Sequence, residues 1–123
     1  MLVGKDRNFK DAQEYFNYLV TTLGYPPVHN KFYSDKIVSE NNVLHLDIYE
    51  HSRKAPTVVF VPGTSIYAMC YAEILASIGQ EGFNIIGIDP RGHGRSSGER
   101  GDYTIRELMN DTQNVITYAI NKF

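Results

Sequence analysis

The chain has 123 residues and a mass of 14.0 kDa; 42% of its residues are hydrophobic, which is enough for one modest core and too little for two. Twelve Lys and Arg residues stand against 14 Asp and Glu, so the formal net charge is -2. This balance gives no electrostatic reason to bind nucleic acid or an anionic membrane. The apolar runs are also much shorter than the ~20 residues of a membrane-spanning helix, so we expect no transmembrane segment.

The cysteine content and the first residues indicate the compartment. Cys70 is the single cysteine, which excludes an internal disulfide. The residues after Met1 turn polar at once and contain no apolar stretch like that of a secretion signal. We therefore expect a cytoplasmic protein, and nothing in the sequence indicates a cofactor.

The first part of the chain is expected to form a helix and a hairpin. Apolar residues recur at helical spacing from Asn8 to Leu23 and predict an amphipathic helix. From Lys31 to His51 the period changes to two, with a break at Glu40, which predicts an antiparallel hairpin. The second strand has an apolar face and a polar face that we expect to meet water; these are Leu44, Leu46 and Ile48 on one side, and His45, Asp47, Tyr49 and His51 on the other.

Two buried strands and a helix are expected next. The continuous apolar run from Thr57 to Val61 predicts a strand buried on both faces, and we expect it to be the central strand. Residues Tyr67 to Ile78 have helical spacing and are followed by Gly79, which we expect to end the helix. A second buried strand is expected from Phe83 to Asp89.

A last helix completes the pattern. Thr104 and Glu107 have the spacing of a capping box, in which each side chain accepts from the backbone N–H of the other residue, and the helix is expected to run close to Phe123. An antiparallel hairpin followed by strand, helix, strand and helix predicts an α/β fold in which helical crossovers join parallel strands.

Two loops carry the functional signal, because ligands of open α/β sheets bind outside the carboxyl ends of the strands. The first loop begins Pro62-Gly63-Thr64-Ser65, where a glycine directly after a strand permits a sharp turn that leaves the next amide free. The second loop, residues 89–98, contains three glycines, two arginines, a histidine and two serines. Such a loop is expected to fold tightly, with side chains bonded to the backbone.

These two segments resemble the α/β-hydrolases, and within them the branch of monoacylglycerol lipases, lysophospholipases and related esterases. Val58-Val59-Phe60-Val61-Pro62-Gly63-Thr64 looks like the third strand and oxyanion loop of the family, although Pro62 stands where a histidine is usual. Asp89-Pro90-Arg91-Gly92-His93-Gly94-Arg95-Ser96 looks like the signature Asp-x-Arg-Gly-x-Gly-x-Ser after the fourth strand. The resemblance implies a partial α/β-hydrolase domain over residues 31–123, the amino-terminal half of the sheet, preceded by a helical extension over residues 1–30.

The resemblance also implies roles for these residues. The backbone N–H of Thr64, next to Gly63, would donate to the oxyanion of a tetrahedral intermediate. The second loop would brace the turn and would not react; its residues are Asp89, Arg91, Gly92, His93, Gly94 and Ser96.

The nucleophile elbow of the family would follow the strand after the last helix, so the resemblance implies that this chain holds no triad residue and is inactive alone. The complete enzyme would hydrolyse a carboxylic ester of a lipid or of a small molecule. The sequence leaves open which ester this is, and whether the nucleophile is Ser, Asp or Cys.

Two serines within the chain remain alternative nucleophiles. Residues 94–98 match the letters Gly-x-Ser-x-Gly around Ser96, with His93 and Asp89 nearby, but Ser96 does not stand directly between a strand and a helix. Ser65 does follow a strand, although it lacks the second glycine of an elbow. We expect neither serine to be a nucleophile.

One strand face of the predicted hairpin carries side chains that can bind a metal. His45, Asp47 and His51 share one strand face and could bind zinc or nickel. These residues are equally expected on a strand face that is exposed to water. A zinc site would also need further ligands. We therefore expect no metal.

The strand order of the family places residues 57–61 beside a fifth strand that this chain lacks. We expect the exposed edge to pair with the remainder of the enzyme or with a second copy. An alternative from another functional class is an oligomeric, non-catalytic binding or assembly module that uses the same half-fold.

Overall fold

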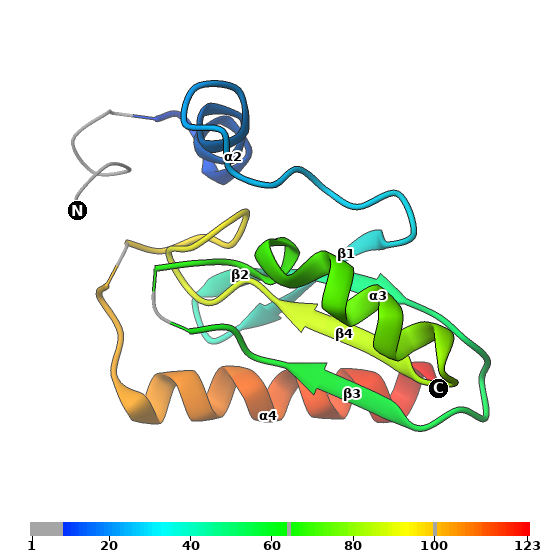
Figure 1. Ribbon diagram of the computed structural model, residues 1–123. Helices are drawn as coiled ribbons and strands as arrows, with labels where there is room; N and C mark the ends of the chain where they lie inside the picture. Colours follow the sequence, from blue (N-terminus) through cyan, green and yellow to red (C-terminus); the bar gives the residue numbers. More distant parts are fainter. Residues whose placement is uncertain (1–8, 64, 100) are drawn as a thin grey trace.

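The computed structural model describes residues 9–63, 65–99 and 101–123. Its four-stranded sheet has the order β1-β2-β4-β3, with β2 antiparallel to β1 and β4, and β3 parallel to β4 (Figure 1). The predicted α/β fold is confirmed. The elements are α2 (Ala12–Thr21), β1 (Tyr33–Ser39), β2 (Asn42–Tyr49), β3 (Thr57–Phe60), the 3-10 helix η1 (Ala68–Tyr71), α3 (Ala72–Gln80), β4 (Asn84–Ile88) and α4 (Ile105–Lys122).

Helices cover both faces of the sheet. In Figure 1, α4 runs along one face, and α3 and α2 lie on the other. The layer under α4 is apolar because period-two alternation directs one set of β2 side chains to it. Its buried members are Leu44, Leu46, Ile48, Ile86, Ile88, Val115 and Ala119. The second layer joins α2 and α3 to the opposite face and includes Tyr15, Phe16, Leu19, Tyr67, Leu75 and Ile85.

The polar face of β2 does not meet water as expected. His45 is 8% exposed and Asp47 is completely buried, while His51, beyond the end of the strand, is exposed. The prediction was wrong because α2 and the loop after β4 cover this face. The guanidinium of Arg95 lies 4.8 Å from the ring centroid of Phe16 on α2, and its Nη2 donates to Asp47 Oδ1 at 2.9 Å.

The strand inside the sheet is β4 and not β3, although the sequence predicts β3 to be central. Every residue of β4 is buried, and β4 pairs with a strand on each side. In the described part of the chain β3 is an outer strand, and its four residues are only half-buried. The expectation that residues 57–61 form the central strand was therefore wrong for this chain. The second expectation, that this strand lies at an open edge of the sheet next to the following strand, is observed.

The helix between these strands differs in two details from the prediction. Its first turn is the 3-10 helix η1, and Gly79 lies inside α3 instead of ending it. A Cβ at Gly79 would approach the ring of Tyr49 to 2.5 Å, and one at Gly87 would approach Ala68 Cβ to 2.6 Å. Both glycines therefore permit close packing of helix on sheet, which real side chains would prevent.

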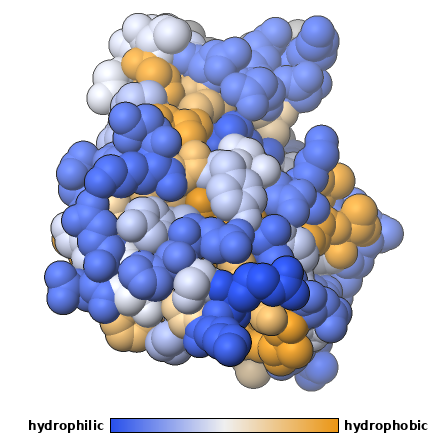
Figure 2. Space-filling view, turned by 90° about the vertical axis from the view of Figure 1, so that its right-hand side faces the viewer, coloured by the Kyte–Doolittle hydropathy of each residue, from blue (hydrophilic) through white to orange (hydrophobic). Residues whose placement is uncertain are grey.

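The capping box at the start of α4 is confirmed, because the N–H of Glu107 donates to Thr104 Oγ1 and the N–H of Thr104 donates to Glu107 Oε1. None of the helices in the described residues has the length and apolar character needed to span a membrane. Figure 2 shows the end of the sheet that lies away from the carboxyl ends of β3 and β4. Hydrophilic side chains cover most of it, and apolar side chains gather in smaller patches.

Candidate functional site

The two loops that the sequence singles out lie together at the carboxyl ends of β3 and β4 (Figure 1). Parallel strands bring their carboxyl ends to one edge of the sheet, so the loop after Phe60 and the loop after Ile88 begin side by side. Side chains of the second loop bond to the backbone of the first, as described below. This pair of loops is the candidate site.

The loop after β4 is closed by its own backbone. The N–H of Ser96 donates to the C=O of His93 at 3.0 Å, and that of Gly92 donates to Ser97 at 2.8 Å. Ser97 also bonds to β2, with its N–H at 2.9 Å from the C=O of Val43. The loop is therefore folded tightly, as its glycine and serine content predicts.

Ser96 is 3% exposed and its hydroxyl has two partners. Oγ donates to the C=O of Asp89 and accepts from the N–H of His45 at 2.8 Å. The hydroxyl thus joins the end of β4 to β2. Its donor proton goes to a backbone carbonyl and not to a histidine ring, so the arrangement differs from that of an activated serine.

Asp89 holds both loops from a buried position. Its Oδ1 accepts from the N–H of Ala68, at the start of η1, at 3.1 Å, and its Oδ2 accepts from the N–H of Arg95 at 3.0 Å. Burial raises the pKa of this carboxyl to about 6, with a further contribution from the nearby carboxylate of Asp47. At Gly94 a Cβ would lie 2.2 Å from Asp89 Oδ2, so only glycine fits against this carboxyl.

His93 is 1% exposed and uses both ring nitrogens. Nδ1 lies 2.7 Å from the C=O of Arg91, and Nε2 lies 3.1 Å from the backbone N of Ser65. A carbonyl can only accept and an amide N–H can only donate, so this geometry requires a neutral ring with its proton on Nδ1. His93 therefore bonds to the backbone of the first loop.

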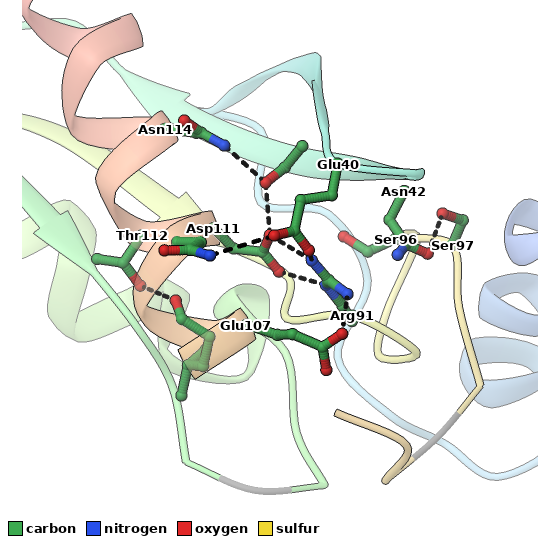
Figure 3. Close-up of polar contacts among 12 residues, drawn as sticks. Glu40, Asn42, Arg91, Ser96, Ser97, Glu107, Asp111, Thr112 and Asn114 are labelled. Carbon is green, nitrogen blue, oxygen red and sulfur yellow. Dashed lines mark hydrogen bonds and ion pairs between the residues drawn. The ribbon is translucent and has the colours of Figure 1, made fainter. Parts of the chain in front are cut away.

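Arg91 anchors the second loop to the far side of the sheet (Figure 3). Its Nε donates to Asp111 Oδ2 at 2.7 Å and its Nη2 to Oδ1 at 3.0 Å, a bidentate pair on α4. Nη2 also bonds to Glu40 in the hairpin turn, and Nη1 lies 3.2 Å from Glu107. The hydrogen bonds to Asp111 raise the pKa of Arg91 above its ordinary value.

The expected oxyanion residues belong to the first loop. Pro62 is buried and Gly63 is exposed, whereas Thr64, the expected donor, lies outside the described residues. Ser65 is exposed and has a φ of 74°, a left-handed conformation that is unfavourable for a residue other than glycine.

A buried polar cluster lies beside the site, but it differs from the metal site considered above. His51 is outside it, and Asp89 joins His45 and Asp47, whose ligand atoms all lie within 4.8 Å of one another. Asp47 Oδ1 already accepts from His45 Nε2 at 3.0 Å and from Arg95. The guanidinium of Arg95 supplies the positive charge here, so we assign no metal.

Sequence reasoning missed the charged partners of these loops. Asp111 is 3% exposed and lies in the apolar stripe of α4, between Leu108 and Val115. A carboxylate in such a stripe indicates a buried cationic partner, and this signal could have identified it. Glu40, in the turn before β2, gives no comparable signal.

The sequence comparison identifies the family. A sequence model described as serine aminopeptidase, S33, matches residues 52–123, which is more than half of the chain. The chain belongs to this hydrolase family. The match includes both loops of the site and the whole of α4. A search of curated proteins finds no significant match.

Solved structures agree with this serine aminopeptidase family in fold. The thioesterase domain from the curacin biosynthetic pathway has 21% identity over 72% of this chain, with a TM-score of 0.65. The α/β-hydrolase GrgF from Penicillium sp. sh18 has 21% identity over 71% and a TM-score of 0.65, and Est1E from Butyrivibrio proteoclasticus, bound to ferulic acid, has 21% over 69% and 0.58. The chain spans only 33%, 31% and 36% of these structures, respectively.

Removing Asp111 tests the anchor of the second loop. Asp111→Ala leaves the buried guanidinium of Arg91 without its bidentate partner, and we expect a loss of about 3 kcal/mol in the free energy of unfolding, measured by urea titration. Asp102→Ala, at an exposed position of the same region, is the control and is expected to change it by less than about 0.5 kcal/mol. Equal effects of the two substitutions would contradict the anchoring role.

The buried carboxyl of Asp89 predicts a pH dependence. Its pKa is about 6 in the folded chain against an ordinary 3.8, so the folded state holds this proton over a range in which the unfolded state has lost it. The contribution of Asp89 to stability is therefore complete below about pH 4 and is lost as the pH rises through about 6. Urea titrations of the wild type and Asp89→Asn across this range should show the wild type losing stability relative to the variant. Parallel pH profiles would refute the assignment.

Proposed function

We propose that this chain forms the oxyanion-loop half of a serine-type α/β-hydrolase that cleaves carboxylic esters of lipids or small molecules. The observation that carries the proposal is the attachment of residues 65–68 to the second loop. Asp89 accepts the N–H of Ala68, and His93 accepts the N–H of Ser65. A donor between Gly63 and Ser65 would thus be presented from a loop that is fixed before the reaction.

Fixed donors are what ester hydrolysis requires. Attack on an ester carbonyl places a negative charge on its oxygen, and N–H groups that already point to that position stabilise the charge without reorganising. The amide of Thr64 would be one of these donors, as the family resemblance implies. The family match supports hydrolase chemistry, and two structural relatives are a thioesterase domain and an enzyme bound to ferulic acid, in keeping with acyl-ester substrates.

We propose further that the chain alone is inert. Ser96 donates its hydroxyl proton to the C=O of Asp89, and Nε2 of His93 accepts from the N–H of Ser65. These two residues therefore do not form a pair of serine nucleophile and general base. The nucleophile, acid and histidine would come from segments outside this sequence. We propose a cytoplasmic location as well, in line with the single cysteine, Cys70, of this chain.

The outer edge of β3 is proposed as the surface that pairs with the remainder of the enzyme or with a second copy. A groove of about 460 Å³ runs between β3 and α4 and is lined by apolar residues that include Val59, Ile116, Ile120 and Phe123. Ile120 is 72% exposed. An outer strand with a free edge beside an apolar groove favours association, because pairing would satisfy the strand and bury the groove.

Fluorophosphonate labelling tests the proposed chemistry. The reagent modifies activated serine nucleophiles, and an intact-mass spectrum of the treated 14.0 kDa chain is expected to show no adduct. A longer form of the polypeptide that carries the elbow is expected to be labelled and to hydrolyse a p-nitrophenyl ester. An adduct on the 14.0 kDa chain that disappears in Ser96→Ala or Ser65→Ala would overturn the claim of inertness. A longer form that is neither labelled nor active would favour the non-catalytic assembly module.

A charge in the groove tests the pairing surface. Ile120→Glu should reduce association of the chain, measured as mass by light scattering over a concentration series, because pairing would bury the added carboxylate. Ile74→Glu, on α3 at 63% exposure and on the other face of the sheet, is the matched control and should leave the mass unchanged. Equal effects, or a monomer at all concentrations in the wild type, would count against self-pairing through β3.

A further inference from the structure

The hydrogen bond between Ser65 and His93 joins two loops that are 28 residues apart in sequence. It is a bond from a backbone N–H to a histidine ring, whose acceptor strength depends on the protonation state and tautomer of the ring. A histidine with no structural constraint could present either nitrogen as acceptor. Here the carbonyl of Arg91, 2.7 Å from Nδ1, fixes which nitrogen carries the proton. Nε2 is left with a lone pair directed at the first loop.

The residue that His93 holds is conformationally strained. Ser65 has a φ of 74°, and among the described non-glycine residues only Glu40 also has a positive φ. A left-handed conformation is unfavourable for such a residue, so it persists only where neighbouring contacts favour it. The bond to Nε2 is such a contact. Without it, the turn at Ser65 would lose one of the contacts that balance its strain.

The position of this bond matters for the reaction. Asp89 already fixes the loop at Ala68, which is three residues further along the chain. His93 fixes it at Ser65, the residue directly after the expected oxyanion donor. Because the ring is 1% exposed, water does not compete for Nε2. The second loop therefore holds the backbone of the first loop at Ser65 through His93, in addition to the contact of Asp89 with Ala68.

We propose that His93 is a positioning residue, whose neutral ring holds the Ser65 amide and thereby fixes the first loop at the residue that follows the expected oxyanion donor. The proposal that the turn is fixed stands on geometry alone. Its consequence for the oxyanion rests on the proposed hydrolase function. In the proposed function His93 acts through the first loop.

Magnetic resonance of the isotopically labelled 123-residue chain tests the proposal directly. A hydrogen bond between an amide N–H and an imidazole nitrogen gives a scalar coupling across the bond, so the Ser65 amide nitrogen should couple to His93 Nε2. The imidazole nitrogen shifts should show the proton on Nδ1 and a lone pair on Nε2. Absence of the coupling in a folded chain, or a proton on Nε2, would overturn the proposal.

Two matched variants separate positioning from packing. His93→Gln can place an amide oxygen near the position of Nε2 and so can still accept from Ser65. His93→Asn can place its amide nitrogen near Nδ1, keeping the bond to Arg91, but it is too short to reach Ser65. Hydrogen exchange at the Ser65 amide should be about five- to ten-fold faster in His93→Asn than in the wild type, and closer to the wild-type rate in His93→Gln. Amides in β2 and β4 should keep their protection in both.

Equal exchange at Ser65 in the wild type and a folded His93→Asn would refute positioning. If a variant does not fold, the coupling in the wild type decides the question. None of these measurements depends on ester hydrolysis. An inactive longer polypeptide with an intact coupling would therefore refute the proposed function and leave the positioning role, whereas an active one without the coupling would do the reverse.

Discussion

The hydrogen-bonding needs of buried backbone at the ends of β3 and β4 constrain the whole structure. Strand pairing ends there, but the first residues of the loop after β4 and Ala68 at the start of η1 remain buried, and unpaired N–H and C=O groups in such a place are strongly unfavourable. Side chains of the loop after β4 meet this need: Asp89 and His93 accept backbone N–H groups of the first loop, and Ser96 bonds to both β4 and β2. The polar residues of this loop therefore fix the position of the site.

The loop after β4 also places two arginine side chains inside the protein, and each of them has a carboxylate beside it. The guanidinium of Arg91 is held by a bidentate carboxylate on α4, and that of Arg95 lies between Asp47 and the ring of Phe16. Asp47 Oδ2 and Arg95 Nε have no hydrogen-bond partner among the described residues. Buried ion pairs contribute less to stability than their Coulomb attraction suggests, because both groups lose hydration. Their value here is specificity, since they fix the loop to the hairpin, α2 and α4.

The candidate site and the open edge of the sheet both depend on β3. β3 delivers the first loop at its carboxyl end, while its outer edge and the groove beside α4 remain uncovered in the described chain. In the proposed function, the first feature would supply oxyanion donors and the second would pair with a further strand. Val58, Val59 and Phe60 of β3 are apolar but only half-buried, and a strand with neighbours on both sides would bury such residues. The same run of residues thus predicts a central strand by composition and forms an outer one here.

The sequence by itself determined the order of elements, the hairpin, the capping box at Thr104 and the identity of the two loops. Each of these depends on local periodicity or on residues that are close along the chain. Only the tertiary structure decided the burial of His45 and Asp47, because α2 and the loop after β4 cover a strand face whose alternation looks like that of a solvent-facing strand. It also decided the pairing of Arg91 with Asp111 and of His93 with Ser65. These partners are 20 and 28 residues apart, and nothing in the local pattern specifies which distant group a buried polar side chain will meet.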